Sequence, residues 1–171
     1  MRGYVQVYTG DGKGKTTAAL GLTLRAVGAG LKVYIAQFIK KGDYSEINAL
    51  KRLAADVTLE QFGCGRFTKG KACNEDIAVA RKGLARIKEI VSSGEYELVI
   101  LDEANVAVTH GLITEQELLD IIDQKPEHME LVITGRNAPA AIVDKADLVS
   151  EVKAIKHYFK KGVNARIGIE K

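Results

Sequence analysis

A glycine-rich segment near the start of the chain constrains the fold more than any other feature. It reads Thr9-Gly10-Asp11-Gly12-Lys13-Gly14-Lys15-Thr16-Thr17, and it lies between an apolar run at residues 4–8 and a helical pattern at residues 16–27. Glycines let the backbone turn tightly and present its N–H groups to phosphate oxygens, and the N-terminus of the following helix adds a partial positive charge. The segment therefore predicts a phosphate-binding loop between a strand and a helix.

Each position of this loop has a predicted role in holding a nucleoside triphosphate. The loop backbone would surround the phosphates, Lys15 would reach the terminal phosphates, and the Thr16 hydroxyl would bind Mg²⁺. The predicted contact residues are Gly10, Asp11, Gly12, Lys13, Gly14, Lys15, Thr16 and Thr17. The common form of the motif has glycine where this chain has Thr9, and here the glycine comes one residue later. The alternative interpretation is a glycine-rich turn with a solvated lysine pair.

Apolar runs of strand length alternate with helical patterns along the rest of the chain. Strands are predicted over residues 4–8, 33–36, 57–61, 98–101, 131–133 and 148–152, with a further edge strand over 163–170. Helices are predicted over residues 16–27, 46–54, 74–93, 115–122 and 140–145. This alternation predicts one α/β domain, residues 1–171, with a single doubly wound, mostly parallel sheet flanked by helices. Ligands bind such sheets at the carboxyl ends of the strands.

Two more polar clusters follow predicted strands and are expected at the same edge of the sheet as the loop. The strand at residues 98–101 runs into Asp102 and Glu103, and one of these carboxylates would hold Mg²⁺ directly or through water. Ordinary surface acids are the alternative. Arg136, after the strand at residues 131–133, either neutralises a phosphate or forms a structural salt bridge.

Three other segments have less specific signals. Residues 37–42 either line the same crevice or form a solvated basic loop. Phe67 lies in a long glycine-containing loop that either covers a substrate or holds a small apolar cluster. His157 is interpreted as a surface histidine.

Composition argues against several classes of protein. A net charge of +3 and the absence of Trp argue against a nucleic-acid-binding surface. No apolar run reaches the roughly 18 residues that a membrane-spanning helix needs, so no membrane association is expected. Cys64 and Cys73 are too few for a disulfide scaffold, and a cytoplasmic protein with reduced thiols is expected.

Taken together, these motifs resemble the ATP:corrinoid adenosyltransferases, a family with the P-loop NTPase (RecA-like) fold. The resemblance covers almost the whole chain and rests on residues 8–21, 25–28, 37–40, 67–68, 101–105, 134–139, 146–149, 156–157 and 168–170. The position of Thr9 in the phosphate loop belongs to this family's pattern.

The resemblance implies a reaction and the residues that carry it. The Co(I) of a reduced corrinoid, either cobalamin or cob(I)yrinic acid a,c-diamide, attacks the 5′ carbon of ATP, and triphosphate leaves. Lys15, Thr16 and Glu103 are the implied catalytic residues, and Thr16 and Glu103 are the implied Mg²⁺ ligands, with Asp102 of the acidic pair as a further candidate ligand. Phe67 matches a family aromatic that faces the corrinoid and helps to displace the lower axial ligand of cobalt. A homodimer and a flavodoxin-type electron donor are also implied.

Two other functions remain open on the sequence. A P-loop ATPase or small-molecule kinase would release ADP or a phosphorylated product. A nucleotide-dependent binding module would bind ATP with negligible turnover.

Overall fold

A single parallel sheet organises the computed structural model, which describes residues 2–65 and 72–171. Its six described strands lie in the order β3-β2-β4-β5-β1-β6, and every neighbouring pair is parallel. They are β1 (Val5–Thr9), β2 (Val33–Phe38), β3 (Val57–Phe62), β4 (Leu98–Asp102), β5 (Glu130–Thr134) and β6 (Leu148–Glu151). The predicted α/β fold with a doubly wound sheet is confirmed.

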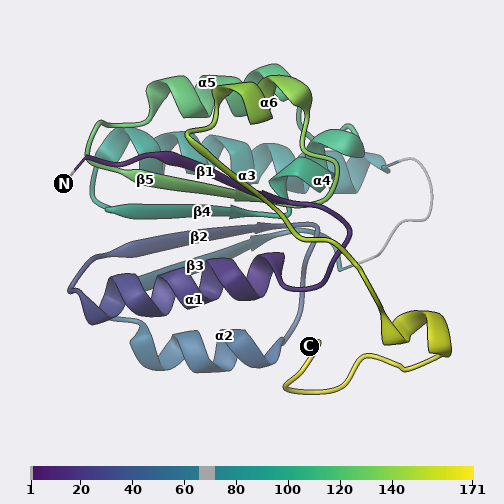
Figure 1. Ribbon diagram of the computed structural model, residues 1–171. Helices are drawn as coiled ribbons and strands as arrows, with labels where there is room; N and C mark the ends of the chain where they lie inside the picture. Colours follow the sequence, from purple (N-terminus) through teal and green to yellow (C-terminus); the bar gives the residue numbers. More distant parts are fainter. Residues whose placement is uncertain (1, 66–71) are drawn as a thin grey trace.

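Helices cover both faces of the sheet (Figure 1). One face carries α1 (Lys15–Gly28) and α2 (Ser45–Leu50), and the other carries α3 (Asn74–Ser93), α4 (Ala104–Thr109), α5 (Glu115–Gln124) and α6 (Ala140–Lys145). Two short 3₁₀ turns follow α2 and β6, at η1 (Lys51–Leu53) and η2 (Tyr158–Lys161). None of the helices in the described ranges is both long and apolar enough to cross a membrane.

The central strands are apolar on both sides because both of their faces are covered. In β2, Val33 and Ile35 point to the α1 side and pack with Ala19 and Ala26. Tyr34, Ala36 and Phe38 alternate with them and join the core beneath α3 and α5. Residues 98–101 of β4 are at most 2% exposed. This unbroken burial explains why the strands read as continuous apolar runs.

The helical predictions are confirmed in place, with differences at their ends. Helix α1 extends one residue beyond the predicted bounds on each side, and the helix predicted over residues 46–54 divides into α2 and η1. Helix α4 is absent from the prediction. Its six residues are ANVAVT, and β-branched residues have low helix propensity, so propensity gives no signal for so short a helix.

The predicted edge strand over residues 163–170 is wrong. The segment forms turns, in which the Arg166 carbonyl accepts hydrogen bonds from the N–H groups of Ile169, Glu170 and Lys171. Arg166 also pairs with Glu170, which closes the turn locally. Ile167 is 83% exposed, so its apolar character does not report a buried strand face.

Candidate functional site

The glycine-rich loop between β1 and α1 is held in place by the chain that follows β6. Val152 donates its N–H to the carbonyl of Thr9 at 2.8 Å, and its own carbonyl accepts the N–H of Gly12 at 2.7 Å. A Cβ atom on Gly10 would lie 2.5 Å from the Val152 oxygen, and Gly10 has φ +96°. Glycine is therefore required at residue 10 for space and for conformation.

Helix α1 begins directly under this loop, with Gly14 as its N-terminal capping residue. The first N–H groups of a helix have no intrahelical partner and carry a partial positive charge. Such an N-terminus after a glycine-rich loop binds phosphate groups. Thr16 and Thr17 lie in the first turn and line the pocket above it.

The Lys15 side chain lies against the backbone of the loop. Its Nζ donates to the carbonyls of Gly10 at 2.7 Å and Gly12 at 2.8 Å, and the residue is 7% exposed. Burial lowers the pKa of Lys15, and the nearby Glu103 carboxylate offsets that effect only in part. A phosphate at the loop would offer this ammonium group a charged partner in place of two carbonyls.

Asp102 is the centre of a buried hydrogen-bond network at the end of β4. Its Oδ1 accepts the hydroxyls of Thr16 at 2.8 Å and Thr134 at 2.7 Å. Its Oδ2 accepts the Gln37 amide at 3.2 Å and the Lys40 ammonium at 2.7 Å. With Asp102 only 1% exposed, these four donors take the place of water around the carboxylate.

Glu103 follows Asp102 and lies in the pocket wall in a left-handed conformation, with φ +61°. Burial raises the pKa of Glu103 and the Asp102 carboxylate raises it further, while Lys40, Lys15 and Arg136 act in the opposite direction. The resulting pKa is above the ordinary value of 4.5. Thus the two acids of the predicted pair have different surroundings: Asp102 is buried in the network, and Glu103 faces the pocket.

Lys40 and Gln37 also belong to this site, although neither was predicted individually as a site residue. Residues 37–42 were expected either to line the crevice or to form a solvated basic loop; Lys40 lines the pocket and Gln37 contacts Asp102, whereas Lys41 and Gly42 are exposed. Strand β2 is the neighbour of β4, and Gln37 lies opposite Asp102 in the register. The order of the strands cannot be read from local patterns, so the proximity of Lys40 to Asp102 had no signal in the sequence.

A pocket of about 640 Å³ lies over the glycine-rich loop. The loop and Lys40 form part of its lining, and residues 44–46 and 168–171 form further parts. The Ser45 hydroxyl donates to the Lys171 carbonyl at 2.9 Å, which ties the two outer walls together. This volume is in the range that small-molecule and cofactor pockets have.

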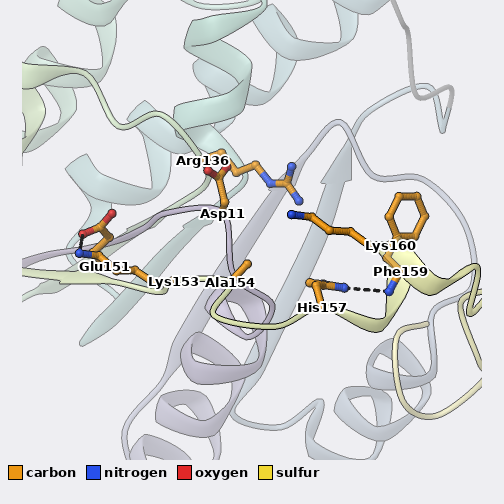
Figure 2. A pocket seen from close by; sticks show the side chains of 8 residues that line it. All are labelled: Asp11, Arg136, Glu151, Lys153, Ala154, His157, Phe159 and Lys160. Atoms are coloured by element: carbon orange, nitrogen blue, oxygen red, sulfur yellow. Dashed lines mark hydrogen bonds and ion pairs between the residues drawn. The ribbon is translucent and has the colours of Figure 1, made fainter.

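A second pocket, of about 680 Å³, adjoins the first on the side of η2 (Figure 2). Arg136 and His157 line both pockets, and Asp11 and Lys160 line the second. In Figure 2 the Arg136 guanidinium and the Lys160 ammonium point toward each other across this space, which indicates a basic pocket wall. His157 is half-buried, and its Nδ1 accepts the N–H of Phe159 at 3.2 Å.

The structure brings the predicted residues of the glycine-rich loop, the acidic pair and Arg136 to one edge of the sheet. Phe67 lies outside the described residues. Thr16, Asp102 and Glu103 supply hydroxyl and carboxylate oxygens, which are the donors that Mg²⁺ prefers. Within residues 2–65 and 72–171 no three His, Cys, Asp or Glu side chains gather into a metal site. A cation here would complete its shell with phosphate and water oxygens, as Mg²⁺ commonly does.

Comparison with known proteins gives a consistent answer along the whole chain. The family model described as "ATP:corrinoid adenosyltransferase BtuR/CobO/CobP" matches residues 1–170. A corrinoid adenosyltransferase of Escherichia coli is 36% identical over 171 residues, which cover 99% of this chain and 86% of that protein. A corrinoid adenosyltransferase of Pseudomonas aeruginosa is 34% identical over 170 residues, with 99% and 84% covered. The corrinoid adenosyltransferase CobA of Salmonella typhimurium is 35% identical, with 99% and 86% covered. This chain belongs to the ATP:corrinoid adenosyltransferase family.

Proposed function

We propose that this protein transfers the 5′-deoxyadenosyl group of ATP to the reduced cobalt of a corrinoid. The electron pair of Co(I) forms the Co–C bond, the bond between C5′ and its oxygen breaks, and that electron pair leaves with triphosphate. The observation that carries the proposal is the glycine-rich loop with Lys15, set beside Asp102 and Glu103, in a chain that matches the family over its whole length.

The triphosphate is the leaving group, so its negative charge must be stabilised as the bond breaks. The N–H groups of the loop and of the first turn of α1 would donate to the phosphate oxygens. Lys15 would exchange its two carbonyl partners for phosphate oxygens, and Arg136 and Lys13 would add positive charge. The cobalt itself is the nucleophile, so no protein base is needed to activate it.

Thr16 and Glu103 are the proposed Mg²⁺ ligands, and Asp102 is proposed to act through its hydrogen bond with Thr16. Asp102 is 1% exposed, and both of its oxygens already accept hydrogen bonds, whereas Glu103 lines the pocket. We therefore assign Asp102 to orienting the Thr16 hydroxyl, which it accepts at 2.8 Å. When bound, Mg²⁺ neutralises charge on the triphosphate.

The corrinoid side of the proposal rests on the family resemblance. Phe67 would face the corrinoid and displace the lower axial ligand of cobalt, which makes reduction to Co(I) accessible to a flavodoxin-type donor. We also propose a cytoplasmic homodimer. The substrate is either cobalamin or the a,c-diamide precursor.

One assay tests the reaction itself. The protein is incubated with ATP, Mg²⁺ and chemically reduced cobalamin, and the corrinoid spectrum is followed together with the phosphate product. We expect a light-sensitive alkylcobalamin and an equal amount of triphosphate. Steady release of ADP with an unchanged corrinoid spectrum would instead indicate a P-loop ATPase.

A matched pair of variants ties that activity to the loop. Lys15→Ala should lower the rate about a hundredfold or more, because it removes a charged group that stabilises the leaving triphosphate. Lys32→Ala removes an exposed lysine that precedes β2, at the end of the strand away from the site, and should leave the rate unchanged.

A further inference from the structure

Lys40 occupies the place where a cation would bind the Thr16 hydroxyl. Its Nζ lies 2.7 Å from Oδ2 of Asp102 and 3.1 Å from Oγ1 of Thr16. The Thr16 hydroxyl donates its proton to Asp102, so it meets Lys40 with an oxygen lone pair. A metal ion bound to Thr16 would need a lone pair on the same oxygen.

The backbone around Lys40 is built to hold this position. Ile39 has φ +67°, a rare conformation for a β-branched residue, and the Lys40 N–H donates to the Phe38 carbonyl at 2.6 Å. This tight turn folds the chain back directly after β2. Gly63 packs against it so closely that a Cβ atom would lie 2.1 Å from the Ile39 carbonyl carbon. Strained turns of this kind persist where the surrounding structure enforces them, and they gather at functional sites.

Charge explains why an ammonium group belongs there. Asp102 is 1% exposed, and Lys40 is the cation in direct contact with it. A buried carboxylate without a positive partner is costly. A divalent cation bound to the Thr16 hydroxyl would also place positive charge close to the Asp102 carboxylate, but it would repel an ammonium group held a few ångströms away. The two cations therefore compete.

We propose that Lys40 is a resident cation that holds the Mg²⁺ site before Mg²⁺ and triphosphate bind and is displaced when they do. The inference rests on the magnesium site of the proposed function. The Lys40 side chain can move into the pocket over the loop, because it already lines that pocket and the centre of the Tyr44 ring lies 6.0 Å from its Nζ. In the displaced position its charge faces the triphosphate.

A purely structural ion pair makes the opposite prediction. If Lys40 only holds Asp102 in place, its loss disorders Asp102 and Thr16, and a metal ion binds more weakly. If Lys40 competes with the metal, its loss leaves a more negative site, and a metal ion binds more tightly.

The test measures Mn²⁺ binding to the whole protein without nucleotide or corrinoid, by electron paramagnetic resonance of free Mn²⁺. Wild type is compared with Lys40→Met and with Lys41→Met, which removes an exposed charge from the same loop. We expect Lys40→Met to bind Mn²⁺ at least about fivefold more tightly than the other two proteins. Thr16→Val should abolish that gain, because it removes the shared oxygen.

Thermal unfolding gives a second readout of the same competition. Mn²⁺ should raise the melting temperature of Lys40→Met more than that of wild type, and Lys40→Arg, which keeps the cation, should resemble wild type. Equal or weaker Mn²⁺ binding by Lys40→Met would overturn the proposal, as would a gain that survives Thr16→Val. No corrinoid enters this measurement. A failed adenosyl transfer assay would thus refute the proposed reaction separately, without altering the outcome for Lys40.

Discussion

Replacing Gly63 with alanine tests whether the turn after β2 is held by close backbone packing. A Cβ atom at residue 63 would lie 2.1 Å from the carbonyl carbon of Ile39 and 2.2 Å from its oxygen. Both are backbone atoms, so no side chain can rotate away to make room. The two turns that follow β2 and β3 must move apart, and Lys40 moves with the first of them.

The expected cost is at the upper end of the range for overpacking. Inserting a methyl group into a tightly packed site costs about 1–3 kcal/mol of stability. Because the clash here is with backbone atoms, we expect a cost of about 3 kcal/mol. For a chain of this size each kcal/mol shifts the melting temperature by roughly 2–4 °C. We therefore expect Gly63→Ala to lower the melting temperature by about 6–12 °C.

Gly21→Ala is the matched control. Gly21 is exposed within α1, and a Cβ atom there meets nothing within 4 Å. Alanine favours a helix interior over glycine by about 0.5–1 kcal/mol, so this variant should be slightly more stable than wild type. Thermal unfolding followed by circular dichroism gives the melting temperatures of both variants, and urea unfolding gives their free energies of unfolding. A Gly63→Ala protein within about 1 kcal/mol of wild type would refute the packing argument.

Three further predictions concern the site and one helix end. Glu103→Gln should make the protein more stable at pH 7 while it slows adenosyl transfer. In wild type, the pKa of Glu103 is raised above 4.5 in the folded protein, so the folded state binds more protons than the unfolded state. The stability of wild type therefore falls as pH rises from 4.5 through that raised pKa. Unfolding curves of Glu103→Gln across pH should lack that fall; a parallel loss in both proteins would contradict the assignment. Thr114→Ala removes the hydroxyl that accepts the Glu117 N–H at the start of α5. It should cost about 1 kcal/mol and leave adenosyl transfer unchanged, as thermal unfolding and the transfer assay can show. Lys15→Arg keeps the charge but not the fit to the Gly10 and Gly12 carbonyls. Its transfer rate should therefore lie between those of wild type and Lys15→Ala, and a rate equal to wild type would mean that charge alone suffices.

Within the described residues, local patterns were sufficient to predict every strand and every α-helix of this fold except α4. The runs at residues 98–101 and 131–133 are apolar throughout because both faces of β4 and β5 are covered. The amino-acid composition of these runs is therefore enough to predict buried strands. The capping pattern at residues 114–117 marks the start of α5, where the structure has both hydrogen bonds of a capping box. The tail at residues 163–170 shows the limit, because apolar residues there are exposed in turns and mimic a strand.

The site needed information that local patterns do not contain. Asp102 was predicted as a site residue because it follows an apolar strand, and Thr16 because it belongs to the glycine-rich motif that begins a helix. Lys40 joins them only because β2 lies beside β4, and strand order is a property of the assembled sheet. The family resemblance included Lys40 within a matching segment, yet it gave no reason for a contact with Asp102.

Backbone strain in the structure also marks this edge of the sheet. In the part of the chain that the structure describes, the non-glycine residues with positive φ are Ile39, Glu103 and Asn137. They follow β2, β4 and β5, at the carboxyl ends where the loop and the acidic pair meet. Each costs of order 1–3 kcal/mol and persists only where its surroundings enforce it. Two of them, Ile39 and Glu103, directly precede or form part of the site, so the backbone strain and the candidate site coincide at this edge of the sheet.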